Sequence, residues 1–444
     1  MTDLYLCGYA ALENGVLQDA AIAVSEGRIA AVGPAADVTP LFPEANRIDW
    51  SAFAAVPGAV NAHSHSFQSL LRGMAVDRPF LEWRDEALYR HTPLLDPDTL
   101  YAGALLAFGE MLTAGVTTVA DFFYVHGPDA ANDDAVIRAA LDLGVRLVFA
   151  RTMYDWPGAP EAYRESVADA TARTRALAVR YAGHPLVSVH PAPHSPHAAS
   201  SDMIRAGHGL ARELGTPYHI HVAEEPFEVE ETLRDHGLRP VHWLDSLGVV
   251  DSSMIAVHLV WLDPDEIALL GARGAALAYC PSSNMFLADG VTRLPDLLAA
   301  GVRVGLGTDG GCSNNRTSVF EEMRMAALLQ KVSRLDATCI SAPTVWQLGT
   351  SSGADLLRLP VGRIAPGKRA DLVAVDPAHL SLQPFHPSLL VAHAVYSMQP
   401  GAIRRVVVEG REVVRDGRIL TVPAEDISAL VAERLGRWPL WNGA

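Results

Sequence analysis

Short, almost continuously apolar runs recur along the chain, and each is followed by a longer stretch with helical periodicity. Stretches such as DTLYAGALLAFGEMLTA carry apolar residues at three- and four-residue spacing, which indicates amphipathic helices. Apolar strands that alternate with helices form parallel sheets, and eight repeats close into a barrel. We therefore predict an α/β fold, a TIM-like (β/α)8 barrel over residues 56–362. Its eight predicted strands are 56–65, 115–124, 145–154, 186–195, 216–224, 254–261, 274–283 and 302–310.

Both ends of the chain follow a different pattern from the central region. Residues 1–55 and 363–420 contain alternating segments punctuated by glycine, which is typical of β-hairpins. Because the two segments flank a barrel, we expect them to pair into one small composite β-sandwich domain, 1–55 plus 363–420. Residues 421–444 have a helical period and are predicted to form a C-terminal helical tail.

Composition narrows the functions that such a fold could serve. The 444 residues carry a formal net charge of −16 without a cluster of Lys or Arg, which argues against nucleic-acid binding. No apolar run reaches the roughly 18 residues that a membrane-spanning helix needs, and the N-terminus lacks the pattern of a signal peptide. The cysteines have no spacing typical of disulfide frameworks or thiolate zinc sites. We therefore expect a cytoplasmic protein that acts on a small molecule and binds neither nucleic acid nor membranes.

Four residues at the ends of predicted strands together suit a metal ion. His63 and His65 alternate along one strand, so both side chains project from the same face. His221 comes from another strand end, and Asp309 ends the eighth strand in GLGTDGG. Three imidazoles and one carboxylate at the mouth of a barrel suit zinc or another borderline divalent ion. We predict one Zn²⁺ per chain, with Fe²⁺ or another divalent metal as the alternative, and a position left open for water.

Two further residues near these strand ends suggest proton chemistry. Glu224 stands three residues after His221, where its carboxylate could exchange a proton with a metal-activated water without binding the ion. His258 ends the sixth strand, in IAVHLVW, and could orient or polarise the same water. We predict that Glu224 and His258 are catalytic.

The scarcity of lysine separates two kinds of metal centre. Binuclear hydrolases of related barrel design bridge their metals with a carboxylated lysine on the fourth strand. Here lysine occurs only at Lys331 and Lys368, outside the predicted strands, and the fourth strand carries His190 and His194 instead. A mononuclear centre is therefore favoured.

Several segments resemble one family over nearly the whole chain. HSHSFQSLLRG, HVAEE, CPSSN, GTDGGCSNN and GRIAPGKRADLVAVD are similar to the amidohydrolase superfamily, in its cytosine-deaminase-like branch with the triazine hydrolases and the guanine and adenosine-type deaminases. This resemblance implies a mononuclear zinc barrel. It implies the proton shuttle Glu224, the water-activating His258, and the metal ligands His63, His65, His221 and Asp309. Asp309 is also implied to be catalytic, because in such enzymes this residue both binds the metal and exchanges protons.

The resemblance also suggests residues that bind the substrate. Gln68 has the spacing of a substrate contact in purine deaminases and formimino-amino-acid deiminases, and His194 matches a substrate-binding histidine of several branches. WRDEALYR and FFYVHG resemble formimidoylglutamate deiminase and place Arg84 and Tyr124 in its pocket. Where that enzyme carries an arginine for the α-carboxylate, this chain has His197, which weakens the formiminoglutamate interpretation. GTDGGCSNNRTSVFEEMRMAALL instead resembles methylthioadenosine and S-adenosylhomocysteine deaminases, although YRHTPLLDP offers no clear counterpart of their ribose-binding glutamate.

These features predict a zinc-dependent aminohydrolase, that is, a deaminase. Metal-bound hydroxide would attack the amidine-type N–C=N carbon of an amino-substituted N-heterocycle, purine-, pterin-, pyrimidine- or triazine-like, and ammonia would leave. Two alternatives stay open: deimination of a formimino amino acid such as formimidoylglutamate, and triazine-type chlorohydrolysis or alkylaminohydrolysis. Glu224 favours deamination, because departure of an amine needs a proton shuttle. A homo-oligomer, a dimer, is expected because dimers are common in similar enzymes.

Overall fold

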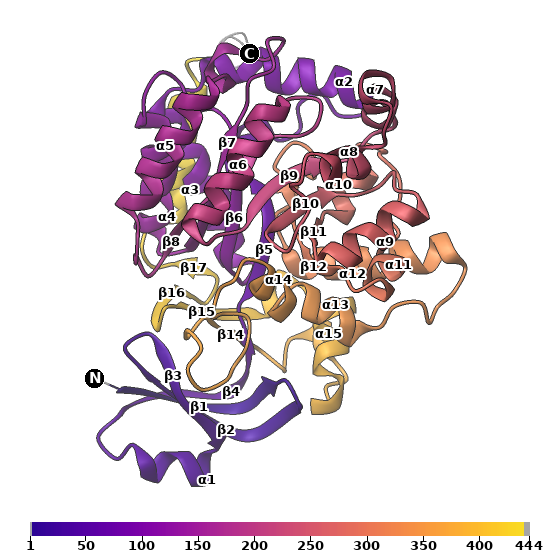
Figure 1. The fold of residues 1–444 in the computed structure, drawn as a ribbon. Coiled ribbons are helices and arrows are strands. Elements are labelled where there is room, and N and C mark those ends of the chain that lie inside the picture. Colours follow the sequence, from indigo (N-terminus) through magenta and orange to yellow (C-terminus); the bar gives the residue numbers. More distant parts are fainter. Residues whose placement is uncertain (1, 439–444) are drawn as a thin grey trace.

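Eight parallel strands form the centre of the molecule and confirm the predicted barrel (Figure 1). The computed structural model describes residues 2–438. β5 to β8 form one parallel sheet together with the short β13 (Asp309–Gly310), and β9 to β12 form a second. The barrel strands are β5 (Ala59–His65), β6 (Val116–Phe123), β7 (Arg146–Met153), β8 (Val187–Pro193), β9 (Tyr218–Val222), β10 (Met254–His258), β11 (Ala276–Tyr279) and β12 (Arg303–Leu306).

The two sheets meet at both of their edges, which closes the barrel. Between β8 and β9, the backbone N–H of His221 donates to the carbonyl oxygen of His194 at 2.9 Å. At the other edge β13 pairs with β5, so that Asp309 lies opposite Ser64. The predicted strand 302–310 is therefore split, because β12 pairs with β11 whereas β13 crosses to β5. This break brings Asp309 to the strand that carries the HxH pair.

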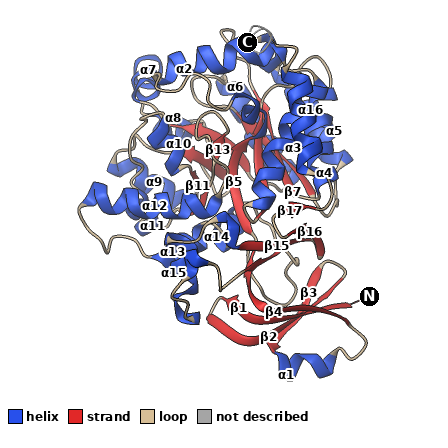
Figure 2. Ribbon diagram, turned by 180° about the vertical axis from the view of Figure 1, so that it is seen from behind, coloured by secondary structure: helices blue, strands red, loops and turns tan. Residues whose placement is uncertain are grey.

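Helices surround the barrel, as the helical periodicity predicted (Figure 2). Several begin at side-chain caps; in α9 Asp263 accepts from the N–H of Glu266, whose carboxylate accepts from the N–H of Asp263. The helices between the barrel strands and beyond β12 are α3 (Pro97–Thr113), α4 (Ala131–Leu143), α5 (Val167–Arg180), α6 (Ser201–Leu214), α7 (Pro226–His236), α8 (Pro240–Ser246), α9 (Pro264–Arg273), α10 (Pro281–Phe286), α11 (Leu294–Ala299), α12 (Val319–Arg334), α13 (Ala342–Leu348) and α14 (Ser351–Leu356).

The two ends of the chain share one eight-stranded sheet, which confirms the composite β domain. Its strand order is β17-β16-β15-β14-β4-β1-β2-β3, and β4 joins the two halves by pairing with β1 and β14. The sheet reaches past residue 55, because Val56 and Pro57 pair with Val373 and Leu372. Its strands are β1 (Thr2–Leu12), β2 (Gly15–Ser25), β3 (Arg28–Pro34), β4 (Asn46–Pro57), β14 (Leu372–Val375), β15 (Ile403–Val408), β16 (Arg411–Arg415) and β17 (Arg418–Ile419).

Four shorter or peripheral helices complete the fold: α1 (Ala35–Val38), α2 (Phe80–Trp83), α15 (Leu390–Tyr396) and α16 (Ala424–Leu435). α16 is the helix expected in the C-terminal tail, of which residues 439–444 lie outside the described part. Its Arg434 forms an ion pair with Asp98 of α3 at 3.4 Å. Within residues 2–438 no helix is long and apolar enough to cross a membrane.

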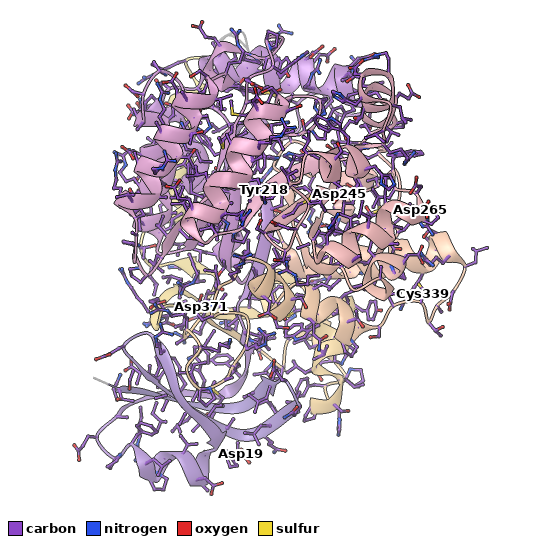
Figure 3. The ribbon with its side chains drawn as sticks, in the orientation of Figure 1. Asp19, Tyr218, Asp245, Asp265, Cys339 and Asp371 are labelled. Carbon is purple, nitrogen blue, oxygen red and sulfur yellow. The ribbon has the colours of Figure 1, made fainter. Side chains whose placement is uncertain are left out.

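A buried ion-pair network joins the barrel to the composite sheet. Arg146, at the start of β7, binds the Asp371 carboxylate through two nitrogens at 2.9 and 3.0 Å and Glu409 at 2.6 Å. A further nitrogen of Arg146 donates to the carbonyl oxygen of Pro185. Asp371 lies where the two regions meet (Figure 3). The sheet is thus fastened to the amino end of the barrel, which leaves the carboxyl ends of the strands free for a site.

Candidate metal centre

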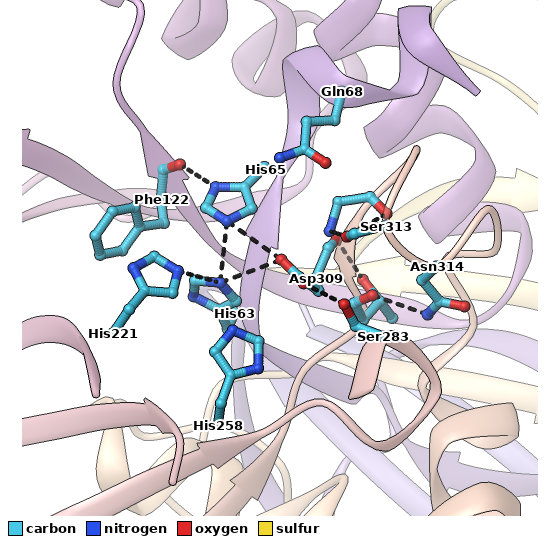
Figure 4. A network of polar contacts seen from close by, with 12 residues as sticks. His63, His65, Gln68, Phe122, His221, His258, Ser283, Asp309, Ser313 and Asn314 are labelled. Carbon is cyan, nitrogen blue, oxygen red and sulfur yellow. Dashed lines mark hydrogen bonds and ion pairs between the residues drawn. The ribbon is translucent and has the colours of Figure 1, made fainter. Parts of the chain in front are cut away.

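The four candidate metal ligands come together at the carboxyl ends of the barrel strands (Figure 4). Nε2 of His63 lies 3.2 Å from Nε2 of His65 and 3.3 Å from Nε2 of His221. Oδ1 of Asp309 lies 3.4 Å from Nε2 of His63 and 3.2 Å from Nε2 of His65. All four side chains are buried. Strands far apart in the sequence therefore direct three imidazoles and one carboxylate toward the same point.

Hydrogen bonds at the far side of two rings determine where these imidazoles carry their protons. Nδ1 of His65 lies 2.6 Å from the carbonyl oxygen of Phe122, and Nδ1 of His221 lies 3.0 Å from that of His194. A carbonyl oxygen only accepts, so Nδ1 donates and Nε2 of the neutral ring keeps a lone pair. Burial favours the neutral ring, because it lowers the pKa of His63 to about 3 and that of His221 well below its usual range. Nε2 of His65 and Nε2 of His221 therefore point lone pairs toward Nε2 of His63, an arrangement that suits a bound cation.

A divalent transition-metal ion fits this donor set. One donor atom from each of His63, His65 and His221 lies within 4.8 Å of the others. Neutral imidazoles and a carboxylate are ligands that zinc and similar ions prefer, and carbonyls that hold the outer nitrogens are typical partners of metal-binding histidines. Ser283 Oγ donates to Oδ2 of Asp309 at 2.5 Å, which leaves Oδ1 facing the histidines.

Glu224 and His258 lie beside these four donors. Oε1 of Glu224 is 3.3 Å from Nε2 of His258, and one atom from each of them and from Asp309 lies within 4.8 Å of the others. Nδ1 of His258 is 2.9 Å from Oδ1 of Asn284, whose amide nitrogen donates to Thr292 Oγ1 at 3.1 Å. The amide oxygen therefore faces the ring, and Nδ1 carries the proton. Nε2 of His258 presents a lone pair that can accept a hydrogen bond from water.

The carboxyl group of Glu224 is surrounded by other acids. Burial raises its pKa, and the charges of Asp289, Glu228 and Asp309 raise it further, to well above its usual range. Without a cation the group therefore holds its proton more tightly than a free glutamic acid does. A divalent cation next to it would lower this pKa, so the group can both donate and accept a proton in the working range of pH.

Backbone strain marks three of the strand ends at this site. Ala223, His258 and Asp309 have φ angles of 52°, 70° and 58°, in the left-handed region that residues other than glycine rarely adopt. The turn that carries Glu224 is held by Glu228, whose carboxylate accepts from the Glu224 N–H at 2.7 Å. Strain of this kind persists where surrounding contacts enforce it, and it clusters at functional sites.

All five candidate substrate-binding residues line one pocket above the metal ligands. The pocket is strongly aromatic, and several of its residues come from α2 and from the π-helical segment that follows it, Arg84–Tyr89. Such a wall suits a flat, largely apolar ligand with a few polar groups. The pocket is lined by His65, Gln68, Phe80, Trp83, Arg84, Leu88, Tyr89, Tyr124, Tyr154, Tyr163, His194, His197, His221, Glu224, His258, Leu287 and Asp309.

Contacts fix the orientation of the Gln68 amide. Its Nε2 donates to the Tyr124 hydroxyl at 3.1 Å, and its Oε1 accepts from Cys312 Sγ at 3.3 Å. Gly310 leaves the space for this amide, because a Cβ there would lie 1.7 Å from Oε1. Gln68 therefore offers the pocket a defined donor.

Arg84 and His197 already have partners in the protein. A guanidinium nitrogen of Arg84 lies 2.8 Å from Asp85, and its charge lies over the ring of Tyr89 at 4.7 Å. Nδ1 of His197 lies 2.8 Å from Oε1 of the buried Glu228. The imidazole of His197 thus contacts the carboxylate that holds the Glu224 turn, which argues against its replacing a carboxylate-binding arginine.

Sequence reasoning missed the residues that orient the candidate catalytic groups. Ser283 fixes the Asp309 carboxylate and Asn284 fixes the tautomer of His258, although neither follows a barrel strand directly. Both lie in the segment CPSSN, which carried the family resemblance and was the available signal. The outer partners of His65 and His221 are backbone carbonyls, which no residue type reveals.

Comparisons with known proteins agree with this geometry. A family model described as "Amidohydrolase family" matches residues 54–413, and one described as "Imidazolonepropionase-like composite domain, bacteria" matches residues 20–45. A 5-methylthioadenosine/S-adenosylhomocysteine deaminase from Desulfovibrio desulfuricans is 37% identical over 408 residues, which cover 91% of this chain and 90% of that protein.

The crystal structure of an adenosine deaminase from Xanthomonas campestris with bound zinc superposes with a TM-score of 0.92 at 32% identity, covering 98% of both chains. Atrazine chlorohydrolase from Arthrobacter aurescens TC1, complexed with zinc, shares the fold at 23% identity with a TM-score of 0.91, covering 98% of this chain and 100% of that one. The chain therefore belongs to the amidohydrolase family, as a hydrolase acting on C–N bonds.

Proposed function

We propose that this enzyme removes the exocyclic amino group of an adenosine-type nucleoside as ammonia. The observation that carries the proposal is the convergence of three imidazole nitrogens and Asp309 beside Glu224 and His258. The relatives that support a nucleoside are the methylthioadenosine/S-adenosylhomocysteine deaminase and the zinc-containing adenosine deaminase, both more than 30% identical. This substrate class is narrower than the amino-substituted heterocycles that the sequence predicts.

The metal in this proposal is one Zn²⁺ per chain, held by His63, His65, His221 and Asp309. Zinc at such a site lowers the pKa of water to about 7 and so supplies a nucleophile at neutral pH. The zinc in both neighbouring structures supports this choice over Fe²⁺.

The side chains around the ion divide the proton transfers among them. Nε2 of His258 accepts a hydrogen bond from the attacking water and orients it toward the amino-bearing carbon. Glu224 takes one proton of this water and delivers it to the ring nitrogen beside that carbon. The second proton goes to the departing amino group. One C–O bond forms and one C–N bond breaks, so water and the aminopurine become a ring carbonyl and ammonia.

Two contacts weigh against the alternative substrates. Formimino amino acids carry an α-carboxylate, which needs a free cationic partner in the pocket, but His197 is paired with Glu228. Displacement of chloride requires no proton on the leaving group, whereas Glu224 lies in the position of a proton donor beside His258. A nucleoside needs neither a carboxylate partner nor a halide site.

Two broader features accompany this proposal. All four cysteines, Cys7, Cys280, Cys312 and Cys339, are free, which fits the reducing cytoplasm. A homodimer is the expected assembly.

Ammonia release from a substrate panel tests the proposal. The zinc-loaded enzyme would be given 5′-methylthioadenosine, S-adenosylhomocysteine, adenosine, guanine, an aminotriazine and formiminoglutamate at equal concentration. We expect kcat/KM for at least one adenosine derivative to exceed every other value by about 100-fold or more, because two or more lost contacts of about 1.4 kcal/mol each give that factor. Turnover confined to formiminoglutamate or the triazine would contradict the proposal.

A further inference from the structure

One face of α12 carries an exposed apolar stripe that the barrel does not use. The inner face of the helix packs into the core through Met323, Ala326, Ala327 and Gln330. On the outer face Leu328 and Val332 lie one turn apart, and Leu335 follows at the helix end with 92% of its surface exposed. Met285 of α10 lies in the same surface groove as this stripe.

The stripe forms one apolar groove. Met285, Met325, Leu328 and Leu329 line this groove together with Val332 and Leu335, which are 66% and 92% exposed. A two-fold axis between two identical chains brings the same surface of each chain together. Two copies of α12 that cross antiparallel near Gln330 would bring Leu328 of each against Val332 of the other.

The charges at the two ends of the stripe suit the same arrangement. Exposed Arg324 stands at the amino end and exposed Asp336 at the carboxyl end, so an antiparallel pair places each opposite its counter-ion. Two cations between them already have partners in the chain: Lys331, which also lines the groove, donates to the Tyr396 hydroxyl at 2.7 Å, and Arg334 is paired with Asp296 at 2.8 Å.

We propose that the outer face of α12, with Met285, is the interface between two copies of this chain. Apolar surface drives the association, and Arg324 and Asp336 set its antiparallel direction. The same face is connected to the candidate metal centre through α10. The Glu322 carboxylate of α12 accepts from the Ser282 N–H of α10 at 3.1 Å, and the neighbouring Ser283 holds the Asp309 carboxylate. Pairing through α12 would stiffen the elements that hold Asp309.

The first test is the mass of Val332→Asp in solution by light scattering after gel filtration. We expect the wild type at twice the chain mass and Val332→Asp at the single-chain mass, with the dissociation constant raised at least about 100-fold because each dimer would bury two unpaired carboxylates. Val179→Asp on α5 is the matched control, since Val179 is also 66% exposed, and it should remain dimeric. A monomeric wild type, or a dimeric Val332→Asp, would overturn the proposal. Vesicle binding by the wild type that Val332→Asp abolishes, without a dimer, would assign the face to lipid and also overturn it.

A charge exchange tests the antiparallel direction independently of apolar burial. Arg324→Asp should raise the dimer dissociation constant about tenfold, since each dimer then holds two Asp–Asp contacts in place of two ion pairs. Adding Asp336→Arg to Arg324→Asp should restore the dimer to within about threefold of the wild type. If the double variant is weaker than Arg324→Asp alone, the antiparallel arrangement is wrong.

Discussion

At the amino end of the barrel, the guanidinium of Arg146 is buried with a partner for each of its nitrogens, in Asp371, Glu409 and a backbone carbonyl. At the carboxyl end, His63, His65 and His221 are equally buried, but the Nε2 atoms of His65 and His221 point lone pairs toward Nε2 of His63. One end of the same barrel satisfies its charged group, and the other brings lone pairs together.

This difference separates the part of the barrel that stabilises the fold from the part that performs chemistry. A satisfied buried network is costly to break and has little to offer a ligand. Converging unprotonated donors cost free energy until a cation binds, and that cost becomes binding affinity for the cation. The left-handed backbone of Ala223, His258 and Asp309 lies at the same end. Strain and unsatisfied donors are thus concentrated where metal and substrate are expected.

The largest effect should follow from removing one of the converging donors. His221→Ala should leave less than about a tenth of the wild-type zinc content and lower kcat/KM at least about 1,000-fold, because the remaining donors cannot hold the ion. His258→Ala is the control, since it should lose turnover while it retains zinc. Metal analysis and steady-state kinetics, with circular dichroism to check folding, measure both. Full zinc content in His221→Ala would contradict the donor set.

Breaking the network at the opposite end should cost stability instead of activity. Arg146→Met leaves the Asp371 carboxylate buried without its cation, which should lower the free energy of unfolding by about 3–5 kcal/mol. Urea titration measures this change, and the folded enzyme should keep its KM. Arg175→Met removes an exposed ion pair with Glu213 and should shift the urea midpoint little. Equal shifts for the two variants would mean that the buried network adds nothing.

A buried histidine outside the metal ligands should make stability depend on pH. Burial lowers the pKa of His190 to about 3, whereas an unfolded histidine has a pKa of about 6.5. Between these values the unfolded chain binds a proton that the folded protein does not, so stability falls as the pH falls from about 6.5 toward 3. At pH 5 this group alone costs about 2 kcal/mol relative to neutral pH.

The metal-free protein offers the cleanest measurement of this dependence. His190→Gln should reduce the drop in urea midpoint between pH 7 and pH 5, and His184→Gln, at an exposed position, should not. An unchanged drop in His190→Gln would show that His190 does not contribute.

The smallest effect concerns the orientation of one pocket amide. Cys312→Ala removes the donor to Oε1 of Gln68 and should lower kcat/KM up to about tenfold, mainly through KM, because one neutral hydrogen bond contributes about 0.5–1.5 kcal/mol. Cys312→Ser keeps a donor at that position and should stay within about threefold of the wild type. Kinetics with an adenosine derivative distinguish the two variants. A serine variant as impaired as the alanine variant would point to packing.

The strand pattern and the convergence of the candidate metal donors could be predicted from the sequence because each has a local signal. Apolar runs separated by helical stretches indicate strands of a parallel barrel, and His63, His65 and His221 stand at the ends of such runs. The break between β12 and β13 could not be predicted, because Asp309 leaves one strand to pair with another about 245 residues away in the sequence. Long-range pairing overrides the local pattern there.

The contacts that support the site could not be predicted from the sequence for the same reason. The contact of His197 with Glu228 joins a loop to the first turn of α7, and it changes His197 from a candidate carboxylate partner into a support for the Glu224 turn. Likewise, the backbone carbonyls of Phe122 and His194 define the tautomers of two candidate metal ligands, and main-chain groups carry no residue signature. Residue type and spacing predict which groups can act, whereas the fold decides how each is held.

The most direct test of the account compares zinc-loaded wild type with zinc-loaded Glu224→Gln in ammonia release from 5′-methylthioadenosine. We expect one zinc per chain in both proteins, and a kcat in the variant that is lower by about 100- to 10,000-fold, because an amide cannot carry the proton from water to the ring. Undiminished ammonia release by Glu224→Gln with its zinc in place would contradict the central claim that this carboxyl drives deamination.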